Sequence, residues 1–211
     1  MASASVSEST KATGNMNEIE FKSAFDAVRF ALAYSTQQYG ETMMAKRLRS
    51  ESAGSGMGLV GLDGAGQAGM IRARVWELPE LHIAVIVARA APRELPCSCG
   101  RTCCSGSRPN PEWRAAIGWL TDASAAYCSG FSHYQVRRAI IERVFGVKCS
   151  LTDVAQDCGA HVNTVSKQNA AVRKWLDGDN KANVTGVIDT AWTAIERKLS
   201  NIGLLKKCEV A

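Results

Sequence analysis

The chain has 211 residues, enough for one large domain or two small ones with a buried hydrophobic core. Hydrophobic residues make up 46% and charged residues 21%, which argues against a disordered chain, a collagen or a coiled-coil rod. Basic residues outnumber acidic ones by 25 to 20, so the net charge is only +5. Because the chain lacks a long apolar run and a secretory signal, we expect a cytoplasmic protein without a membrane partner.

The N-terminal third divides into a tail, an arm and a linker. Residues 1–16 are small and polar and predict a disordered tail. Over 17–50 we expect a helical arm, because apolar residues from Phe21 onwards recur at helical spacing. Residues 51–66 are rich in glycine, which is costly inside a helix, so they predict a flexible linker. These glycines lack the GxxxxGK[ST] pattern of a phosphate-binding loop.

The rest of the chain predicts an all-α fold, a helical bundle. Segment 79–91 is the most apolar, and its β-branched residues would also suit a buried strand. Residues 92–111 form a Cys-rich, Pro-containing loop inserted between helices. The main domain is expected to span 67–178, followed by a C-terminal helix and tail over 179–211. The other expected helices cover 67–78, 112–127, 132–145, 150–158, 161–176 and 184–199.

Residues 150–176 are the most informative stretch, because they predict a helix, a tight turn and a second helix. Gly159 falls at the turn, where a positive φ is needed. Ala155 is small enough for a close helix crossing, and Val162 and Val165 are expected to anchor the second helix to the first. This spacing is typical of a helix-turn-helix; the alternative is an ordinary helical hairpin with a solvated polar face.

The second helix of this pair carries a predicted base-reading face. Such side chains hydrogen-bond base edges in the major groove of DNA. Between Phe131 and Leu176 the chain has seven basic and only three acidic residues, so most of the net charge is local and suits phosphate contacts. The predicted base-reading residues are His161, Asn163, Thr164, Ser166, Lys167 and Gln168. The predicted phosphate-binding residues are Arg137, Arg138, Arg143, Lys148, Arg173 and Lys174.

Half of the eight cysteines fall within one short stretch, at Cys97, Cys99, Cys103 and Cys104. In a chain without an export signal, clustered cysteines suggest a metal before disulfides. We expect one structural Zn²⁺, because zinc takes four thiolates and neutralises their mutual repulsion. Adjacent cysteines do not easily face one ion, so one ligand could instead come from Cys128, His82 or His133. The alternatives are a redox pair or free thiols.

No enzyme signature is present, and we expect neither catalysis nor a small-molecule substrate. The three histidines lack motif partners, and the scattered aspartates fit helix caps or solvated positions better than acid–base pairs. The five tryptophans fall at helical spacing with other apolar residues, which favours core packing over a ligand box.

Two resemblances follow from these motifs. Residues 151–176, ending in CGAHVNTVSKQNAAVRKWL, resemble the DNA-binding region 4 of sigma factors. Together with the preceding stretch 68–72 (AGMIR), this segment resembles the phage Q-type late-gene antitermination proteins, some of which carry a zinc-binding insertion between helices. The resemblance covers about half of the chain.

The resemblance implies a sequence-specific DNA-binding antitermination factor in a bacterial host cell. Proteins of that family bind double-stranded DNA at a late promoter, join paused RNA polymerase, and make it ignore terminators. RNA polymerase, with or without its sigma factor, would therefore be a partner. The sequence leaves two alternatives: a helix-turn-helix regulator acting at initiation, and a zinc-stabilised protein-interaction module without a DNA role.

Overall fold

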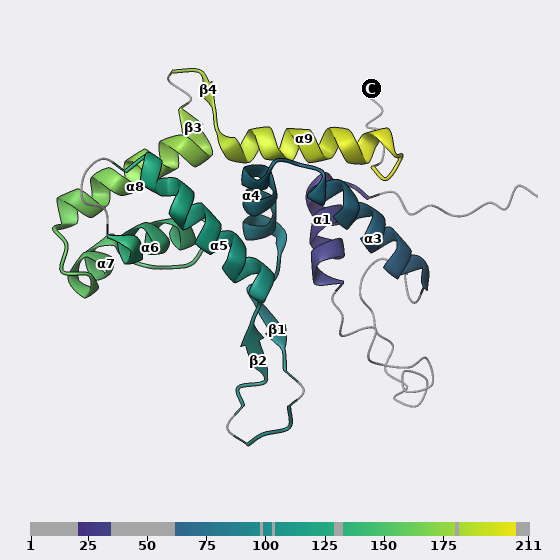
Figure 1. The fold of residues 1–211 in the computed structure, drawn as a ribbon, viewed down its shortest axis with the longest axis horizontal. Helices are drawn as coiled ribbons and strands as arrows, with labels where there is room; N and C mark the ends of the chain where they lie inside the picture. The colour runs from purple at the N-terminus through teal and green to yellow at the C-terminus, as the bar shows by residue number, and fades with distance from the viewer. Residues whose placement is uncertain are drawn as a thin grey trace, which may run out of the picture.

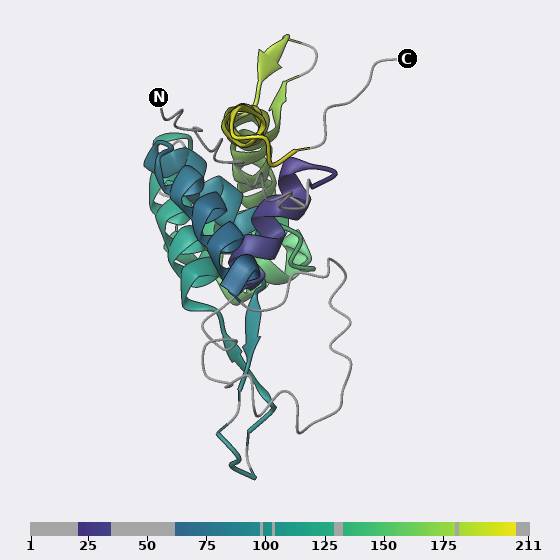
Figure 2. The same ribbon diagram turned by 90° about the vertical axis from the view of Figure 1, so that its right-hand side faces the viewer.

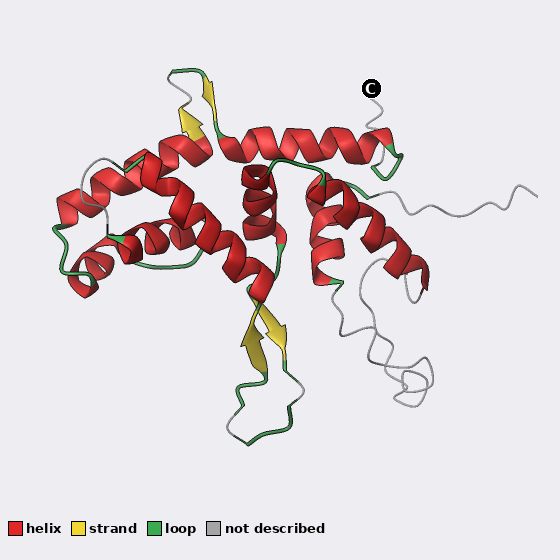
Figure 3. Ribbon diagram, in the orientation of Figure 1, coloured by secondary structure: helices red, strands yellow, loops and turns green. Residues whose placement is uncertain are grey.

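The computed structural model describes residues 21–34, 62–97, 99–102, 104–128, 133–179 and 182–205. Helices account for most of these residues, which confirms the predicted helical class (Figures 1 and 3). None of the helices in these ranges is both long and apolar enough to cross a membrane. The helices are α1 (Ala24–Ala33), α3 (Leu62–Trp76), α4 (Glu80–Ala90), α5 (Pro111–Ala123), α6 (Tyr134–Val144), α7 (Leu151–Asp157), α8 (Val162–Asp177) and α9 (Val187–Asn201), with a 3-10 turn η1 (Ser124–Ala126) after α5.

Helix α4 lies at the centre of the larger group of helices. Its residues 84–88 are all buried, which a helix shows only where neighbours cover it on every side. Helices α1, α3, α5 and α9 pack against it, and in Figure 1 it lies between α5 and α3 with α9 across its top. This burial stabilises a helix over the segment whose β-branched residues would also have suited a strand.

Helices α6, α7 and α8 form a second, smaller group. They pack on one another around Ile140, Ile141 and Val165, all fully buried. Helix α5 contacts α6, and α9 contacts α8, so these two long helices join the small group to the α4 group. The two groups share one continuous core.

The predicted linker over 51–66 is wrong at its C-terminal end, because α3 already begins at Leu62. The face of α3 that includes Ala68 and Ile71 is buried, and α3 packs against α1. This burial offsets the backbone entropy that helical glycines lose. The tail 1–16, the end of the arm and residues 51–61 lie outside the described residues.

The Cys-rich loop contains a β-hairpin that the sequence did not predict. Strand β1 (Glu94–Pro96) pairs antiparallel with β2 (Ser107–Pro109), with Leu95 opposite Arg108. Three-residue strands that contain proline are too short to show an alternating pattern. Figure 2 shows this hairpin extending away from the helices.

A second small hairpin separates α8 from α9. Strands β3 (Gly178–Asp179) and β4 (Val184–Thr185) pair antiparallel, so α9 begins three residues later than predicted. Gly178 has φ +86°, and a Cβ there would lie 2.4 Å from the carbonyl oxygen of Val184. Only glycine fits such a close approach.

Side-chain caps fix several helix starts. As predicted, Ser150 caps α7 by accepting a hydrogen bond from the N–H of Thr152. The cap predicted at Ser132 falls outside the described residues; α6 begins after His133, whose side chain makes no cap hydrogen bond.

Asn110 joins the base of the Cys-rich hairpin to the start of α5. Its side chain is almost fully buried, and its Oδ1 accepts from the N–H of Glu112 at 2.9 Å. Its Nδ2 donates to the carbonyl oxygen of Pro92 at 2.7 Å, and its backbone N–H donates to that of Arg93 at 2.8 Å. One side chain therefore caps α5 and satisfies a loop carbonyl that would otherwise have no protein donor.

We predict that Asn110→Ala lowers the free energy of unfolding by about 2–3 kcal/mol, because it removes a helix cap and leaves a polar group unpaired. The exposed Asn201→Ala is the matched control, and should change the stability by less than about 0.5 kcal/mol. Urea unfolding followed by circular dichroism measures both. Equal stability of the two variants would show that Asn110 does not hold this junction.

Candidate nucleic-acid interface and metal centre

Helices α7 and α8 are joined by a tight turn over residues 158–161. Gly159 has φ +61°, as its predicted place in the turn requires. The N–H of Ala160 donates to the carbonyl oxygen of Ala155 at 2.8 Å, and that of Gly159 donates to Gln156 at 3.2 Å. These bonds satisfy the end of α7 and fix the direction in which α8 leaves the turn.

The buried stripe of α8 differs from the prediction in two positions. Val165, Gln168, Val172 and Leu176 are buried, whereas Val162 is 39% exposed. Because α8 packs on α6 as well as on α7, its buried stripe passes through position 168. Gln168 therefore does not belong to the polar surface on which the sequence placed it, and Val162 does not anchor the helix.

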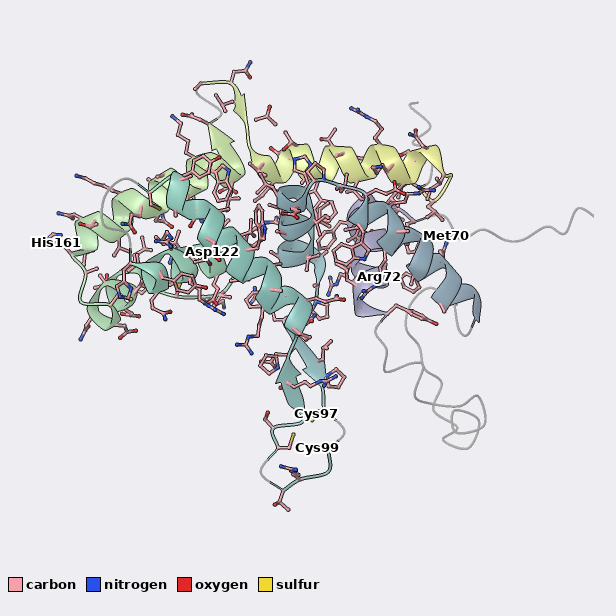
Figure 4. All side chains as sticks on the ribbon, in the orientation of Figure 1. Met70, Arg72, Cys97, Cys99, Asp122 and His161 are labelled. Carbon is pink, nitrogen blue, oxygen red and sulfur yellow. The ribbon has the colours of Figure 1, made fainter. Side chains whose placement is uncertain are left out.

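The remaining predicted base-reading residues are exposed: His161, Asn163, Thr164, Ser166 and Lys167. They occupy the first turns of α8, and Figure 4 shows His161 at one end of the molecule. Nδ1 of His161 accepts from the N–H of Asn163 at 3.2 Å, so this residue is also the N-cap of α8. In the described part of the chain, no side chain pairs with Asn163, Thr164 or Lys167. These polar groups are consequently available to another molecule.

The three arginines of α6 are engaged within the protein. Nε of Arg137 donates to the carbonyl oxygen of Thr121 at 3.2 Å. Arg138 forms an ion pair with Glu142 at 2.9 Å, and this hydrogen bond raises the pKa of Arg138. Arg143 donates to the carbonyl oxygen of Cys149. The sequence shows how many charges α6 carries, but it does not show that Arg137 and Arg143 bond to neighbouring segments and that Arg138 pairs within the helix.

A shallow hollow beside α7 gathers basic side chains from three elements. Arg143, Lys148 and Arg173 line it together with Asp153. Lys148 and Arg173 are exposed, so their charges face solvent at the edge of the α7–α8 pair. Lys174 lies nearby in sequence and pairs with Asp179 at 3.2 Å, a surface ion pair of little energetic weight.

The tip of the β1–β2 hairpin brings three cysteines together. The Sγ atoms of Cys97, Cys99 and Cys104 all lie within 4.8 Å of one another, so they could hold a metal ion. Figure 4 shows Cys97 and Cys99 at this tip. The N–H of Cys97 donates to Gly106 at 2.8 Å, and that of Cys104 to Arg101 at 3.0 Å, which folds the tip back on itself. Cys103 lies outside the described residues, and among those described neither Cys128, His82 nor His133 joins the cluster.

The pKa values of two thiols in the cluster are shifted in opposite directions. Hydrogen bonds from the backbone N–H of Arg101 and from the thiols of Cys104 and Cys97 lower the pKa of Cys99. A hydrogen bond from the N–H of Cys99 likewise lowers the pKa of Cys97. The thiols of Cys99 and Cys104 outweigh this effect, so the pKa of Cys97 is raised. The hydrogen bonds of the cluster therefore favour the thiolate of Cys99 more than that of Cys97.

Separately, burial raises the pKa of the Cys128 thiol. This residue is buried in the helical core, away from the hairpin cluster.

The chain thus presents a polar, partly basic helix face at one end and a thiol cluster on a projecting hairpin. The helix face can donate and accept hydrogen bonds, and the thiol cluster can ligate a soft cation. None of the protein families, curated proteins or solved structures compared with the chain matches it.

Proposed function

We propose that the chain is a sequence-specific DNA-binding protein that places the first turns of α8 in the major groove. The observation that carries this proposal is the exposed, unpaired polar surface of α8, held by the buried contacts of Val165, Val172 and Leu176. A helix face that only meets water can carry side chains that are ion-paired with one another. Unpaired amide, hydroxyl and ammonium groups, by contrast, are suited to hydrogen-bond the edges of bases.

Each exposed residue has a definite chemistry in this proposal. The amide of Asn163 can bond the N6 and N7 edge of adenine in two places, and Lys167 can donate to guanine. Thr164 and Ser166 can bond either a base or a phosphate. His161 contributes mainly by capping α8, and the buried Gln168 is not among the proposed base readers.

The proposed phosphate contacts are fewer than the sequence predicted. Arg173 and Lys174 are exposed on the last turns of α8 and Lys148 is exposed in the loop before α7, whereas Arg137 and Arg138 make contacts within the protein. Lys148, Arg173 and Lys174 would neutralise up to about three phosphates, so log K against log salt should have a slope of about −3.

We predict that Asn163→Ala combined with Lys167→Ala weakens binding about 100-fold to the duplex that the wild-type chain enriches from a random library. Each lost base contact should cost about 1–3 kcal/mol. Arg197→Ala with Asn201→Ala is the matched control, since it removes the same kinds of side chain at the same spacing from the exposed face of α9. Fluorescence anisotropy measures both affinities.

The control pair should bind like the wild type. Equal binding by both pairs would show that the first turns of α8 do not read the duplex, and a wild-type chain that enriches no duplex would favour the interaction module without a DNA role. Arg173→Ala should weaken binding evenly across sequences and reduce the salt slope by about one.

We further propose that the hairpin cluster holds one structural Zn²⁺. Zinc favours thiolates at tetrahedral spacing, and Cys97, Cys99 and Cys104 already supply three close sulfur atoms. When bound, the ion would fix the shape of a hairpin tip that has little core of its own. Cys103 is the fourth ligand proposed from the sequence, because it lies in the same loop.

Metal analysis should find about one zinc per chain in the wild type, and a loss of that zinc in Cys104→Ser. Cys149→Ser is the control, because Cys149 lies against α6, where its thiol donates to the carbonyl oxygen of Ala139. Cys103→Ser tests the fourth ligand. The proposal would be contradicted if the wild-type chain, purified with zinc present, carried no zinc and had every thiol reactive.

The resemblance to Q-type proteins supports a narrower proposal, that the DNA-bound chain joins RNA polymerase and suppresses termination. A terminator read-through assay with purified polymerase tests it. Read-through that requires both the enriched DNA site and Asn163 and Lys167 is the expected result. Activation or repression of initiation without read-through would identify a conventional regulator instead.

A further inference from the structure

A trough on the surface of the α4 group lies outside the proposed DNA and metal sites. Arg72 of α3 and Glu112 of α5 form an ion pair at 2.8 Å that connects the two helices. Arg72 is fixed in place by a second bond from its Nε to the carbonyl oxygen of Ala31 at 3.0 Å. Glu112 lines two hollows and Arg72 lines one of them; these two hollows together are called the trough.

The hollow of about 370 Å³ has an apolar floor and two tryptophan walls. Trp76, Ile83, Val87 and Trp119 line it, together with Glu80 and Glu112. Trp76 is 46% and Trp119 is 38% exposed, whereas Trp113 is buried. The prediction that the tryptophans pack in the core is therefore wrong for these two residues, and exposed aromatic rings around one hollow are typical of protein-binding surfaces.

The α3 side of the trough is unusually smooth. Gly69 lines the hollow that Arg72 also lines, and Gly66 lies one turn before it on α3; both are exposed, and a Cβ built at either position meets no atom within 4 Å. Neither glycine has a positive φ, so neither the packing nor the backbone of this chain requires glycine there. Each costs the helix roughly 1 kcal/mol relative to alanine. The missing side chains leave room for another backbone to approach α3.

The charges around the Trp76–Trp119 hollow have one sign. Its two ionisable lining residues, Glu80 and Glu112, are both acidic. Glu112 is neutralised by Arg72, but in the described part of the chain Glu80 has no cationic partner. A second copy of this chain docked by a two-fold axis at this hollow would bring the same acidic rim against itself, which is unfavourable.

From this combination we propose that the trough is a docking site for an amphipathic helix of a protein partner, with a large apolar side chain between Trp76 and Trp119 and basic residues beside Glu80. The aromatic walls bury the apolar anchor, and the carboxylate of Glu80 selects the positive charges. This surface is separate from α8, so it serves a partner that the chain can bind while it holds DNA.

Fluorescence polarisation of three labelled amphipathic peptides tests the proposal. The peptides share leucine and tryptophan at helical spacing and differ only in their other positions, which are all lysine, all serine or all glutamate. The lysine peptide should bind most tightly and the glutamate peptide least. Trp119→Ser should weaken binding of the lysine peptide about tenfold or more, and Glu80→Lys should weaken its binding as well.

Two controls match these variants. Val184→Ser removes an exposed apolar side chain elsewhere, and Glu196→Lys makes the same charge change on α9. Both should bind the lysine peptide like the wild type, and Trp119→Ser should keep its thermal stability and its DNA affinity. Failure of the lysine peptide to bind, or equal binding by Trp119→Ser, would overturn the proposal. A wild-type dimer in sedimentation velocity that Trp119→Ser dissolves would overturn it as well, since the occupant would then be a second copy.

Discussion

The structure depends on the burial of α4 on all of its sides. Residues 84–88 of α4 are all buried, which requires other helices to pack around this part of the helix. Helices α1, α3, α5 and α9 do so. Two of these enclosing helices, α5 and α9, extend beyond α4 and reach the α6–α8 group. The position of the proposed DNA-binding helix is thus set by an apolar segment that is not among the proposed DNA contacts.

Polar groups then connect the peripheral elements to this core. Asn110 ties the cysteine hairpin to α5, and Arg72 ties α3 to α5. Arg137 of α6 bonds to the end of α5, and Arg143 of α6 bonds to the loop before α7. The three arginines of α6 are therefore engaged within the protein, and the exposed basic residues that remain on or beside α8 are Lys148, Lys167, Arg173 and Lys174. Such a surface favours recognition through hydrogen bonds over binding by charge alone.

The sequence predicted most helices well, because their apolar spacing and capping residues act locally. Gly159 and Ser150 lie as predicted, since a positive φ and a helix cap are properties of a few residues. The errors came from tertiary contacts. Gln168 is buried because α8 packs on two helices, and α3 starts early because one face of it, including Ala68 and Ile71, is buried and the helix packs against α1.

The same division applies to the candidate sites. Close cysteine spacing predicted a thiol cluster, and three of the four cysteines do lie together. The hairpin that presents them was not predictable from three-residue strands. Tryptophans at helical spacing gave no sign that Trp76 of α3 and Trp119 of α5 lie exposed at one hollow, because that depends on how α3 and α5 pack against α4.

The most direct test of the central claim, that α8 is the DNA-reading element, is amide chemical-shift mapping of the full chain at about 0.15 M salt. The ligand is the duplex enriched by the wild-type chain. The account predicts that the largest shifts gather at residues 161–167 and at Lys148 and Arg173, and that α1, α9 and the α3–α5 trough stay unchanged. Shifts concentrated on the cysteine hairpin or the trough, with the first turns of α8 unaffected, would contradict it.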